Sequence, residues 1–414
     1  MKKRRKVALA LSLALCFCMP NAHAQVQNTT DKVVVSFDEE DSEELILNYV
    51  PDYDNDEEGA YFTVSLAGSD MIYNGYQMDI HLPAGMSVLH DEEDNLKVRL
   101  AGPVAGASSS AETIYPYTYT KVNKTLYTYT YQHGLTLNIL DDNVLRVVCV
   151  SMQGESDFKA TSGDLLYVYV KASPYMKPGD VHVTIDNVVL NHNEWDPVNE
   201  MYNAISYVPT VPCGGTMSDV VSGECNDVPL VISATNHWST CILPFATAIP
   251  DGVKAYTSSA SDAENIFLAE SESIEAYTPY ILYSEGGYNG TVSGTVDANN
   301  YPESGIVTAG NLTGAIVPQT VQSGYILQKH NETVMFYAID ENDSFFVPAG
   351  KCWMNITANN AKALNFVVEN SETAIEQAKD ANNTNIIYDL TGRRINTIKQ
   401  GGLYIKNGEK FINK

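Results

Sequence analysis

Tyr76-Gln-Met-Asp-Ile-His-Leu82 is the stretch that decides the fold class of this 414-residue chain. Apolar and polar side chains alternate along its whole length, which is the period of a β-strand with one buried face. The same alternation recurs between residues 32 and 207, at 61–66, 165–170 and 181–185. Because no comparably long stretch has helical periodicity, the sequence predicts an antiparallel β-sandwich over residues 32–207.

A second group of short strands is expected from residue 228 to residue 369, because apolar segments again alternate with turn-forming Gly, Asn, Asp and Ser. These segments are 238–245, 252–256, 278–282, 324–328, 335–337 and a closing strand at 361–369. Residues 208–227, rich in Pro and Gly, are predicted to be a linker or a disulfide-closed loop. Residues 370–385 are expected to form a helical or flexible connector before a tail at 386–414 with Thr-Gly and Asn-Gly turn signals. The predicted fold class is therefore all-β, with two antiparallel β-sandwich-like domains and a short β-rich C-terminal tail.

Residues 1–24 have the pattern of an export signal peptide. Basic residues at 2–6 precede an apolar run too short to span a bilayer, and Ala22-His-Ala24 matches a small-x-small cleavage site. We expect the mature chain to begin at Gln25. No later apolar segment reaches the roughly 18 residues of a transmembrane helix, so the mature chain is predicted to have no membrane-spanning segment.

The chain is strongly acidic, with a formal net charge of −26 that becomes −31 when the five basic residues of the leader are removed. Such a surface repels polyanions, so nucleic acid is a poor partner. Its expected role is to keep an exported protein soluble, with calcium binding as the alternative. Asp52, Asp54 and Asp56 alternate like the first ligands of a calcium loop, but Glu57 stands where that loop needs Gly and Thr63 where it needs Glu. A solvated acidic turn is therefore preferred, and no other cofactor is predicted.

Five cysteines remain after cleavage: Cys149, Cys213, Cys225, Cys241 and Cys352. Cys213 and Cys225 enclose a segment rich in Gly and Ser that a disulfide could close at little strain, so we predict this bridge in an oxidising compartment. It would stabilise the fold by roughly 3 kcal/mol. Cys149 lies in an apolar run and is expected in the core.

No catalytic motif is present in the mature chain. Gly-x-Ser-x-Gly, His-Glu-x-x-His, a phosphate-binding Gly-rich loop and Cys-x-x-Cys are all absent. We therefore predict no catalytic residues and no enzyme. A glycoside hydrolase is the minor alternative, because its two carboxylates are defined by their separation in space and not in sequence. Trp238 and Trp353 stand in apolar strand contexts and are expected in the core.

Six tyrosines form the one candidate binding constellation, three alternating along one segment and three along the next: Tyr115, Tyr117, Tyr119, Tyr127, Tyr129 and Tyr131. A hairpin turning at Asn123 would place Tyr119 opposite Tyr127, and the other two pairs likewise, so that all six rings share one face. That face either covers the core, since tyrosine favours strands, or is exposed and stacks on sugar rings or on a partner protein.

Four segments between residues 32 and 207 carry a family resemblance through their order and spacing: Gly75-Tyr-Gln-Met-Asp-Ile-His-Leu-Pro-Ala-Gly85, Leu145-Arg-Val-Val, Ser162-Gly-Asp-Leu-Leu-Tyr-Val and Gly179-Asp-Val-His-Val. They resemble the cohesin-like sandwiches of exported Bacteroidetes proteins. Cohesins are related in fold to a group of carbohydrate-binding modules, so the resemblance implies a binding domain and not an enzyme. It does not specify a ligand, because the fold hosts several. The second domain is similar to β-rich modules that accompany such sandwiches.

Ile386-Ile-Tyr-Asp-Leu-Thr-Gly-Arg-Arg394 and Gly402-Leu-Tyr-Ile-Lys-Asn-Gly408 form a second resemblance. They resemble the C-terminal sorting tail of the Bacteroidetes type IX secretion system. The resemblance implies the secretion machinery as a partner and an extracellular or outer-surface location. Full-length sorting domains also carry an upstream Asn-Pro motif, which is absent between residues 370 and 385, so the resemblance implies export more than covalent surface attachment.

Together these features predict a secreted or surface-associated, non-catalytic binding protein whose partner is a glycan or a surface protein. The alternatives are a protein scaffold module of the cohesin kind and a spacer that presents other domains. A flat exposed aromatic strip would favour a glycan. An apolar patch with a polar rim would favour a protein.

Overall fold

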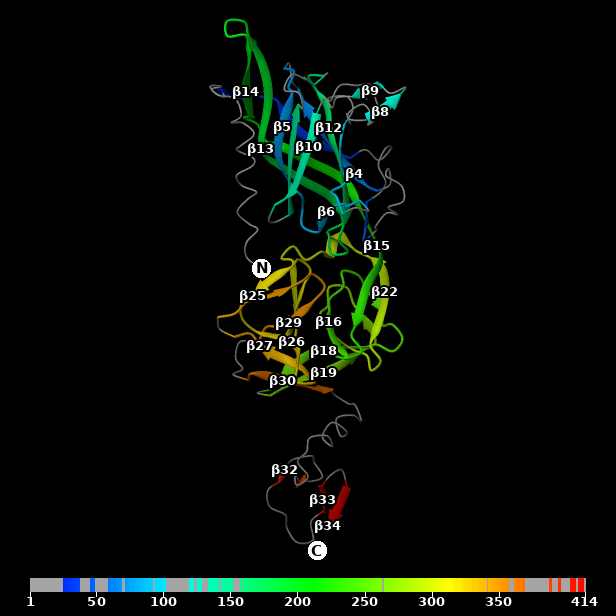
Figure 1. Cartoon of the computed structure of the whole chain (residues 1–414). Helices are drawn as coiled ribbons and strands as arrows, with labels where there is room; N and C mark the ends of the chain where they lie inside the picture. Colours follow the sequence, from blue (N-terminus) through cyan, green and yellow to red (C-terminus); the bar gives the residue numbers. More distant parts are fainter. Residues whose placement is uncertain are drawn as a thin grey trace. The chain divides into compact units, whose positions relative to one another are not determined.

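The computed structural model describes residues 25–37, 45–48, 59–68, 71–91, 94–101, 119–122, 125–128, 133–140, 143–151, 157–158, 160–262, 264–340, 342–356 and 361–368, with four short strands between residues 387 and 412 (Figure 1). Within these ranges nearly all regular structure is β-strand, and the one helix is a 3-10 turn, η4 (Ala298–Asn300), so the all-β prediction is confirmed. No helix of the described ranges is long and apolar enough to cross a membrane. The chain divides into two compact units: unit 1 is Met1–Asp227 with Thr295–Asn299, and unit 2 is Val228–Gly294 with Asn300–Lys414.

Unit 1 is built on the strand order β10-β11-β5-β13-β15-β3-β12-β4-β2, with β1, β6, β7 and β14 paired to its members. The strands are β1 (Gln25–Thr29), β2 (Lys32–Ser36), β3 (Leu45–Leu47), β4 (Tyr61–Ala67), β5 (Gly75–His81), β6 (Met86–Val88), β7 (Val98–Leu100), β8 (Tyr119–Val122), β9 (Thr125–Thr128), β10 (His133–Ile139), β11 (Val144–Ser151), β12 (Gly163–Ala172), β13 (Gly179–Asp196), β14 (Met201–Pro209) and β15 (Cys213–Ile232).

The stretch that decides the fold class is the central strand β5. It pairs with β11 on one side and with β13 on the other, so that Ile80 lies between Leu145 and Ile185. The apolar positions of β5, from Tyr76 to Ile80, are at most 1% exposed, because both neighbouring strands also bury their apolar faces. The predicted two-residue alternation therefore becomes the core of unit 1. Cys149, on β11, is 1% exposed, which confirms its expected place in this core.

The segment predicted as a linker or disulfide loop is instead strand. Residues 213–232 form β15, which pairs with β13 through Cys213 opposite Ile185 and with β3 through Cys225 opposite Leu47. Both cysteines are free thiols, so the predicted bridge is wrong. The physical reason is that the segment between the two cysteines is an extended strand. Twelve residues of strand rise about 40 Å, whereas the Cα atoms of a disulfide lie only about 6 Å apart.

Among the strand pairs whose register is described, most are antiparallel, as predicted, but four are parallel. These are β1 with β14, β3 with β12, β3 with β15, and β19 with β30. The sequence did not predict these parallel pairs. Alternation reports which face of a strand is buried and carries no information on the direction of its neighbour.

Unit 2 is built on the order β16-β21-β18-β19-β30-β27-β26-β29-β24-β23. Its core cluster is formed by side chains from eight of these strands, including Ile266, Leu312 and Phe336, each 0% exposed. The strands are β16 (Trp238–Cys241), β17 (Thr247–Ala248), β18 (Lys254–Ser261), β19 (Asn265–Ser271), β20 (Ser273–Ile274), β21 (Tyr280–Tyr283), β22 (Tyr288–Thr295), β23 (Ile306–Ala309), β24 (Leu312–Ala315), β25 (Gln319–Val321), β26 (Tyr325–His330), β27 (Thr333–Ala338), β28 (Phe345–Val347), β29 (Cys352–Met354) and β30 (Ala363–Val368).

The tail contains a small sheet of its own, in the order β32-β31-β33-β34. Its strands are β31 (Ile387–Tyr388), β32 (Arg394–Ile395), β33 (Leu403–Lys406) and β34 (Glu409–Ile412). The leader at 1–24 and the connector at 370–385 lie outside the described residues.

Candidate binding surfaces

The predicted tyrosine hairpin is present, but its register differs from the prediction. Strands β8 and β9 pair so that Tyr119 lies opposite Thr128 and Thr120 opposite Tyr127, one residue away from the predicted alignment. The last pair of the described hairpin is Val122 opposite Thr125. The predicted pairing of Tyr119 with Tyr127 is therefore wrong. The other four tyrosines lie outside the described residues: Tyr115, Tyr117, Tyr129 and Tyr131.

The candidate calcium ligands Asp52, Asp54 and Asp56 also lie outside the described residues. Within the described ranges no group of three or more His, Cys, Asp or Glu side chains could hold a metal ion.

A projecting two-stranded ribbon is the first candidate binding surface. In β13 the residues up to Asn191 pair with β5 as well as with β14, whereas His192–Asp196 pair with β14 alone. Figure 1 shows this end of β13 and β14 extending beyond the other strands of unit 1. Side chains near its tip therefore lack the neighbours that bury the rest of the sheet.

The tip of this ribbon carries an exposed aromatic pair. Trp195 and Tyr202 are direct cross-strand partners, their ring centroids are 5.0 Å apart and their planes meet at 64°. Trp195 is 50% exposed, Tyr202 is 40% exposed, and Val198 in the connecting turn is 87% exposed. We call these three residues the ribbon tip. Large apolar side chains held at this exposure are typical of interaction sites.

The turn that carries the ribbon tip is held by one carboxylate. Asp196 Oδ1 accepts hydrogen bonds from the backbone N–H of Val198 at 2.8 Å and of Asn199 at 3.3 Å, and Oδ2 accepts one from the Asn199 side chain at 2.7 Å. The Asn199 side chain, followed by the two backbone donors, lowers the pKa of Asp196. The carboxylate therefore stays ionised and fixes the turn. The residues next to the ribbon tip in sequence, Glu194, Asn199 and Glu200, are polar.

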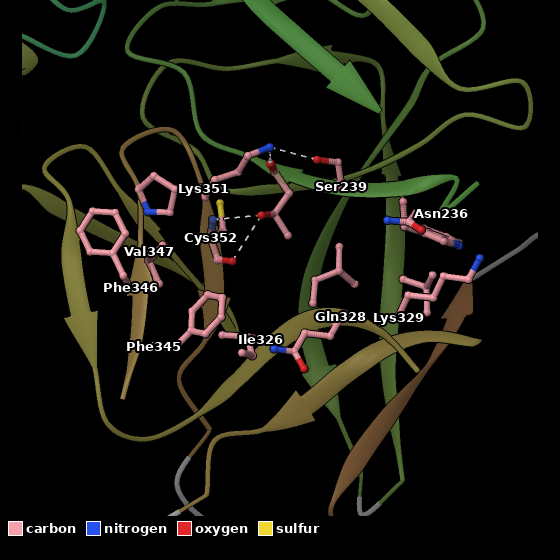
Figure 2. A pocket seen from close by; sticks show the side chains of 15 residues that line it. Asn236, Ser239, Ile326, Gln328, Lys329, Phe345, Phe346, Val347, Lys351 and Cys352 are labelled. Carbon is pink, nitrogen blue, oxygen red and sulfur yellow. Dashed lines mark hydrogen bonds between the residues drawn. The ribbon is translucent and has the colours of Figure 1, made fainter. Parts of the chain in front are cut away.

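A groove in unit 2 is the second candidate surface (Figure 2). It has a volume of about 410 Å³ and is lined by residues of β16, β26 and β28 and by the chain at 347–352. Phe345 and Phe346 of β28 are 37% and 60% exposed, whereas Val347 is 2% exposed and packs against Ile326. The groove therefore presents two phenylalanine rings above an apolar base.

Two lysines give this groove its polar character. Lys351 Nζ donates to Ser239 Oγ and to the Thr240 carbonyl oxygen, each at 3.1 Å, and Figure 2 shows it at the edge of the cavity. Lys329 Nζ donates to the Thr235 carbonyl oxygen at 2.9 Å and lies 3.3 Å from a carboxylate oxygen of Glu332, whose side chain is 92% exposed. Two cations on one groove are unusual in a chain with 51 acidic and 25 basic residues.

The tryptophans divide into two kinds. Trp353 is 5% exposed, which confirms its predicted place in the core. Trp238 is only partly buried: it packs against the core of unit 2, with ring centroids 4.7 Å from Tyr283 and 4.5 Å from Phe366, and its other side lines the groove. Trp195 was not identified from the sequence. The available signal was its context, Asn193-Glu-Trp195-Asp, in which polar residues stand on both sides of the ring.

No family model and no curated protein matches this chain. One similar solved structure is the seventh ScaB type I cohesin from Pseudobacteroides cellulosolvens, with 7% sequence identity and a TM-score of 0.27; the match covers 46% of this chain and 92% of that one. Another is CaCohA2 from Clostridium acetobutylicum, with 12% identity and a TM-score of 0.26; the match covers 47% of this chain and 95% of that one. A non-cellulosomal cohesin from the hyperthermophilic archaeon Archaeoglobus fulgidus is also similar, with 8% identity and a TM-score of 0.23; the match covers 47% of this chain and 91% of that one. Because these identities and TM-scores are low, function is inferred below from the residues of this chain.

Proposed function

We propose that this chain is an exported, non-catalytic binding protein whose ribbon tip inserts into a protein partner. The observation that carries the proposal is the exposed pair of Trp195 and Tyr202 on a projecting ribbon. Trp and Tyr dominate the hot spots of protein interfaces, because each buries a large rigid surface at little entropic cost. The ordered turn at Asp196 supports the proposal, since a pre-organised tip loses little freedom on binding.

The geometry of the tip favours a protein over a glycan. A sugar chain that stacks on two rings needs them in one plane, whereas these two planes meet at 64°. The tip is instead an apolar protrusion with a polar rim, which fits a pocket on a protein surface. A glycan remains the second candidate, because Glu194 and Asn199, the sequence neighbours of Trp195 and Val198, could accept and donate hydrogen bonds to sugar hydroxyls.

Binding to intact cells tests this function. We expect the labelled mature chain to bind cells of the producing bacterium saturably, and this binding to be lost after protease treatment of the cells but kept after periodate oxidation of their sugars. Trp195→Ala and Tyr202→Ala should each weaken binding by about 30-fold, since a hot-spot residue contributes about 2 kcal/mol or more. Their melting temperatures should change little, because an exposed cross-strand pair is worth about 0.2 to 1 kcal/mol.

Ile139→Ala is the matched control. Ile139 is an apolar strand residue of the same unit and is 40% exposed, so its removal should leave binding unchanged. Binding by Trp195→Ala at the affinity of the unsubstituted chain would reject the ribbon tip as the site. Loss of binding after periodate but not after protease would assign the site to a glycan.

A further inference from the structure

We propose that the groove of unit 2 is a strand-addition site for an extended peptide that carries a carboxylate. This surface is separate from the ribbon tip, and the inference does not depend on the function proposed for that tip. Its basis is that two strands lining the groove each have one edge with no partner strand, over most of its length, among the residues that the structure describes.

The first open edge belongs to β26. This strand pairs with β27 along its whole length, from Tyr325 to His330, but with β29 at Tyr325 alone. From Ile326 onward, the side of β26 away from β27 has no paired strand within the described parts of the chain. The same four residues, Ile326 to Lys329, line the groove.

The hairpin register shows which backbone groups face this edge. The two-residue turn at Asn331 and Glu332 has positive φ angles of 48° and 71°, as in a type I′ turn, and His330 pairs with Thr333 across it. The pair that closes such a turn is hydrogen-bonded, and bonded and non-bonded pairs then alternate along the ladder. The N–H and C=O groups of Leu327 and Lys329 therefore point away from β27, towards the groove.

The second open edge belongs to β16. This strand pairs with β21 and with no other strand of the described residues. At its far end the Thr240 carbonyl oxygen accepts from Lys351, and the Ile242 N–H donates to the Gly350 carbonyl oxygen, so the chain at 350–352 closes one end of the edge. Trp238 and Ser239 line the groove beside this closed end.

The side chains around these edges define what the added strand must carry. Successive side chains of a strand point to opposite faces, so alternate residues of an added strand would face the groove, which Phe345 and Phe346 line. Among the described residues, the hydrogen-bond partners of Lys351 Nζ are neutral oxygens, Ser239 Oγ and the Thr240 carbonyl. An ammonium group in this position attracts a carboxylate, and the acidic surface elsewhere on the chain would repel one. The occupant is therefore an extended peptide with alternating apolar residues and at least one Asp or Glu.

The test uses peptides selected on the protein itself. Phage-displayed random heptamers are selected on the full mature chain, and the enriched consensus is synthesised with a fluorescent label for polarisation measurements. We expect apolar residues to alternate and an acidic residue to recur. Methylation of the peptide backbone nitrogen at alternate positions should lower affinity by tenfold or more for one set of positions and leave it unchanged for the other, because only every second N–H bonds a strand edge.

Variants of the protein test the carboxylate. Lys351→Met should weaken binding about tenfold and abolish the preference for Glu over Gln in the peptide, with only a small fall in melting temperature from the loss of its hydrogen bonds to Ser239 and Thr240. Lys254→Met, which removes an exposed lysine on β18 outside the groove, is the control and should bind like the unsubstituted chain. Trp195→Ala should also bind the peptide normally. Absence of an enriched consensus, equal effects of methylation at both sets of positions, or unchanged binding by Lys351→Met would each overturn the proposal.

Discussion

At the scale of single residues, Asp79 shows how a polar position of the central strand becomes part of the core. Its side chain is only 4% exposed, and its two carboxylate oxygens accept from Arg146 Nε at 2.7 Å and from Arg146 Nη2 at 2.6 Å. Asn187 adds a third hydrogen bond at 2.8 Å. Burial by itself would raise the pKa of Asp79, but the hydrogen bonds from Arg146 and Asn187 and the charge of Arg146 outweigh it and lower the pKa.

Asp79→Asn should therefore destabilise unit 1 by about 3 kcal/mol, because it leaves the largely buried Arg146 without its anion. Urea unfolding at pH 7 measures this loss. A lowered pKa means that the carboxylate stabilises the folded state above its unfolded pKa of about 3.9 and ceases to do so as the pH falls through the folded value. The difference between the two proteins should thus shrink below about pH 4.

The control for this prediction is an exposed ion pair. Lys254 and Glu270 are 3.4 Å apart, and both side chains are at least 50% exposed. Glu270→Gln should change the free energy of unfolding by less than about 1 kcal/mol. A similarly small loss for Asp79→Asn would show that the Asp79–Arg146 pair contributes no more than a surface pair.

At the scale of elements, β15 depends on glycines where other strands approach closely. Gly214 has a φ of +101°, and a Cβ atom placed on it would lie 2.2 Å from the Val183 carbonyl oxygen of the paired strand β13. A methyl group there is strained by the backbone conformation and also collides with backbone atoms that cannot move independently. Gly214→Ala is expected to cost about 3 kcal/mol or more.

Gly179→Ala separates the two contributions. Gly179 has a φ of +102°, but a Cβ atom there would meet nothing within 4 Å, so only the conformational strain of about 1 to 2 kcal/mol should appear. Thermal unfolding of the two variants measures the difference. Equal losses would mean that β13 and β15 can separate slightly to accommodate the methyl group.

Strand β5 could be predicted from the sequence, whereas β15 could not, because of its glycines. The alternation at 76–82 predicts β5 within one residue at each end, because periodicity directly reports a buried face. Residues 208–227 were misassigned because Pro and Gly usually indicate loops. Here Gly214 and Gly223 sit where the backbone of Val183 or Val296 approaches too closely for a side chain. Such approaches arise from tertiary packing, which local composition does not record.

The candidate sites were harder to predict than the strands. The tyrosine pattern indicated a hairpin, but a one-residue change in the turn shifts every pairing, and local sequence specifies turn length poorly. Exposure of Trp195 depends on where β5 ceases to pair with β13, which is set by strands distant in sequence. The groove combines β16 and β28, which are about a hundred residues apart in the chain.

At the scale of the whole molecule, the tail at 386–414 resembles a sorting signal and contains the small sheet of β31 to β34. We predict that deletion of residues 386–414 leaves the protein in the periplasm, with its leader removed, because the secretion machinery would no longer recognise it. Immunoblots of periplasm, cell surface and medium, with N-terminal sequencing at Gln25, measure this outcome.

A reporter protein with an export leader and residues 386–414 at its C-terminus is the complementary control, and it should reach the cell surface or the medium. Normal export of the truncated chain, or periplasmic retention of the reporter, would show that the export signal lies elsewhere.

The division of the chain has a genetic consequence. Residues Thr295–Asn299 belong to unit 1 although they lie between the two segments of unit 2, Val228–Gly294 and Asn300–Lys414, and β15 continues past the boundary at Asp227. A recombination event with one crossover on each side of unit 2 would therefore remove part of unit 1 and cut a continuous strand. Domains that are reshuffled between genes normally begin and end in exposed linkers. These two units are accordingly expected to be inherited together, and not exchanged singly between genes.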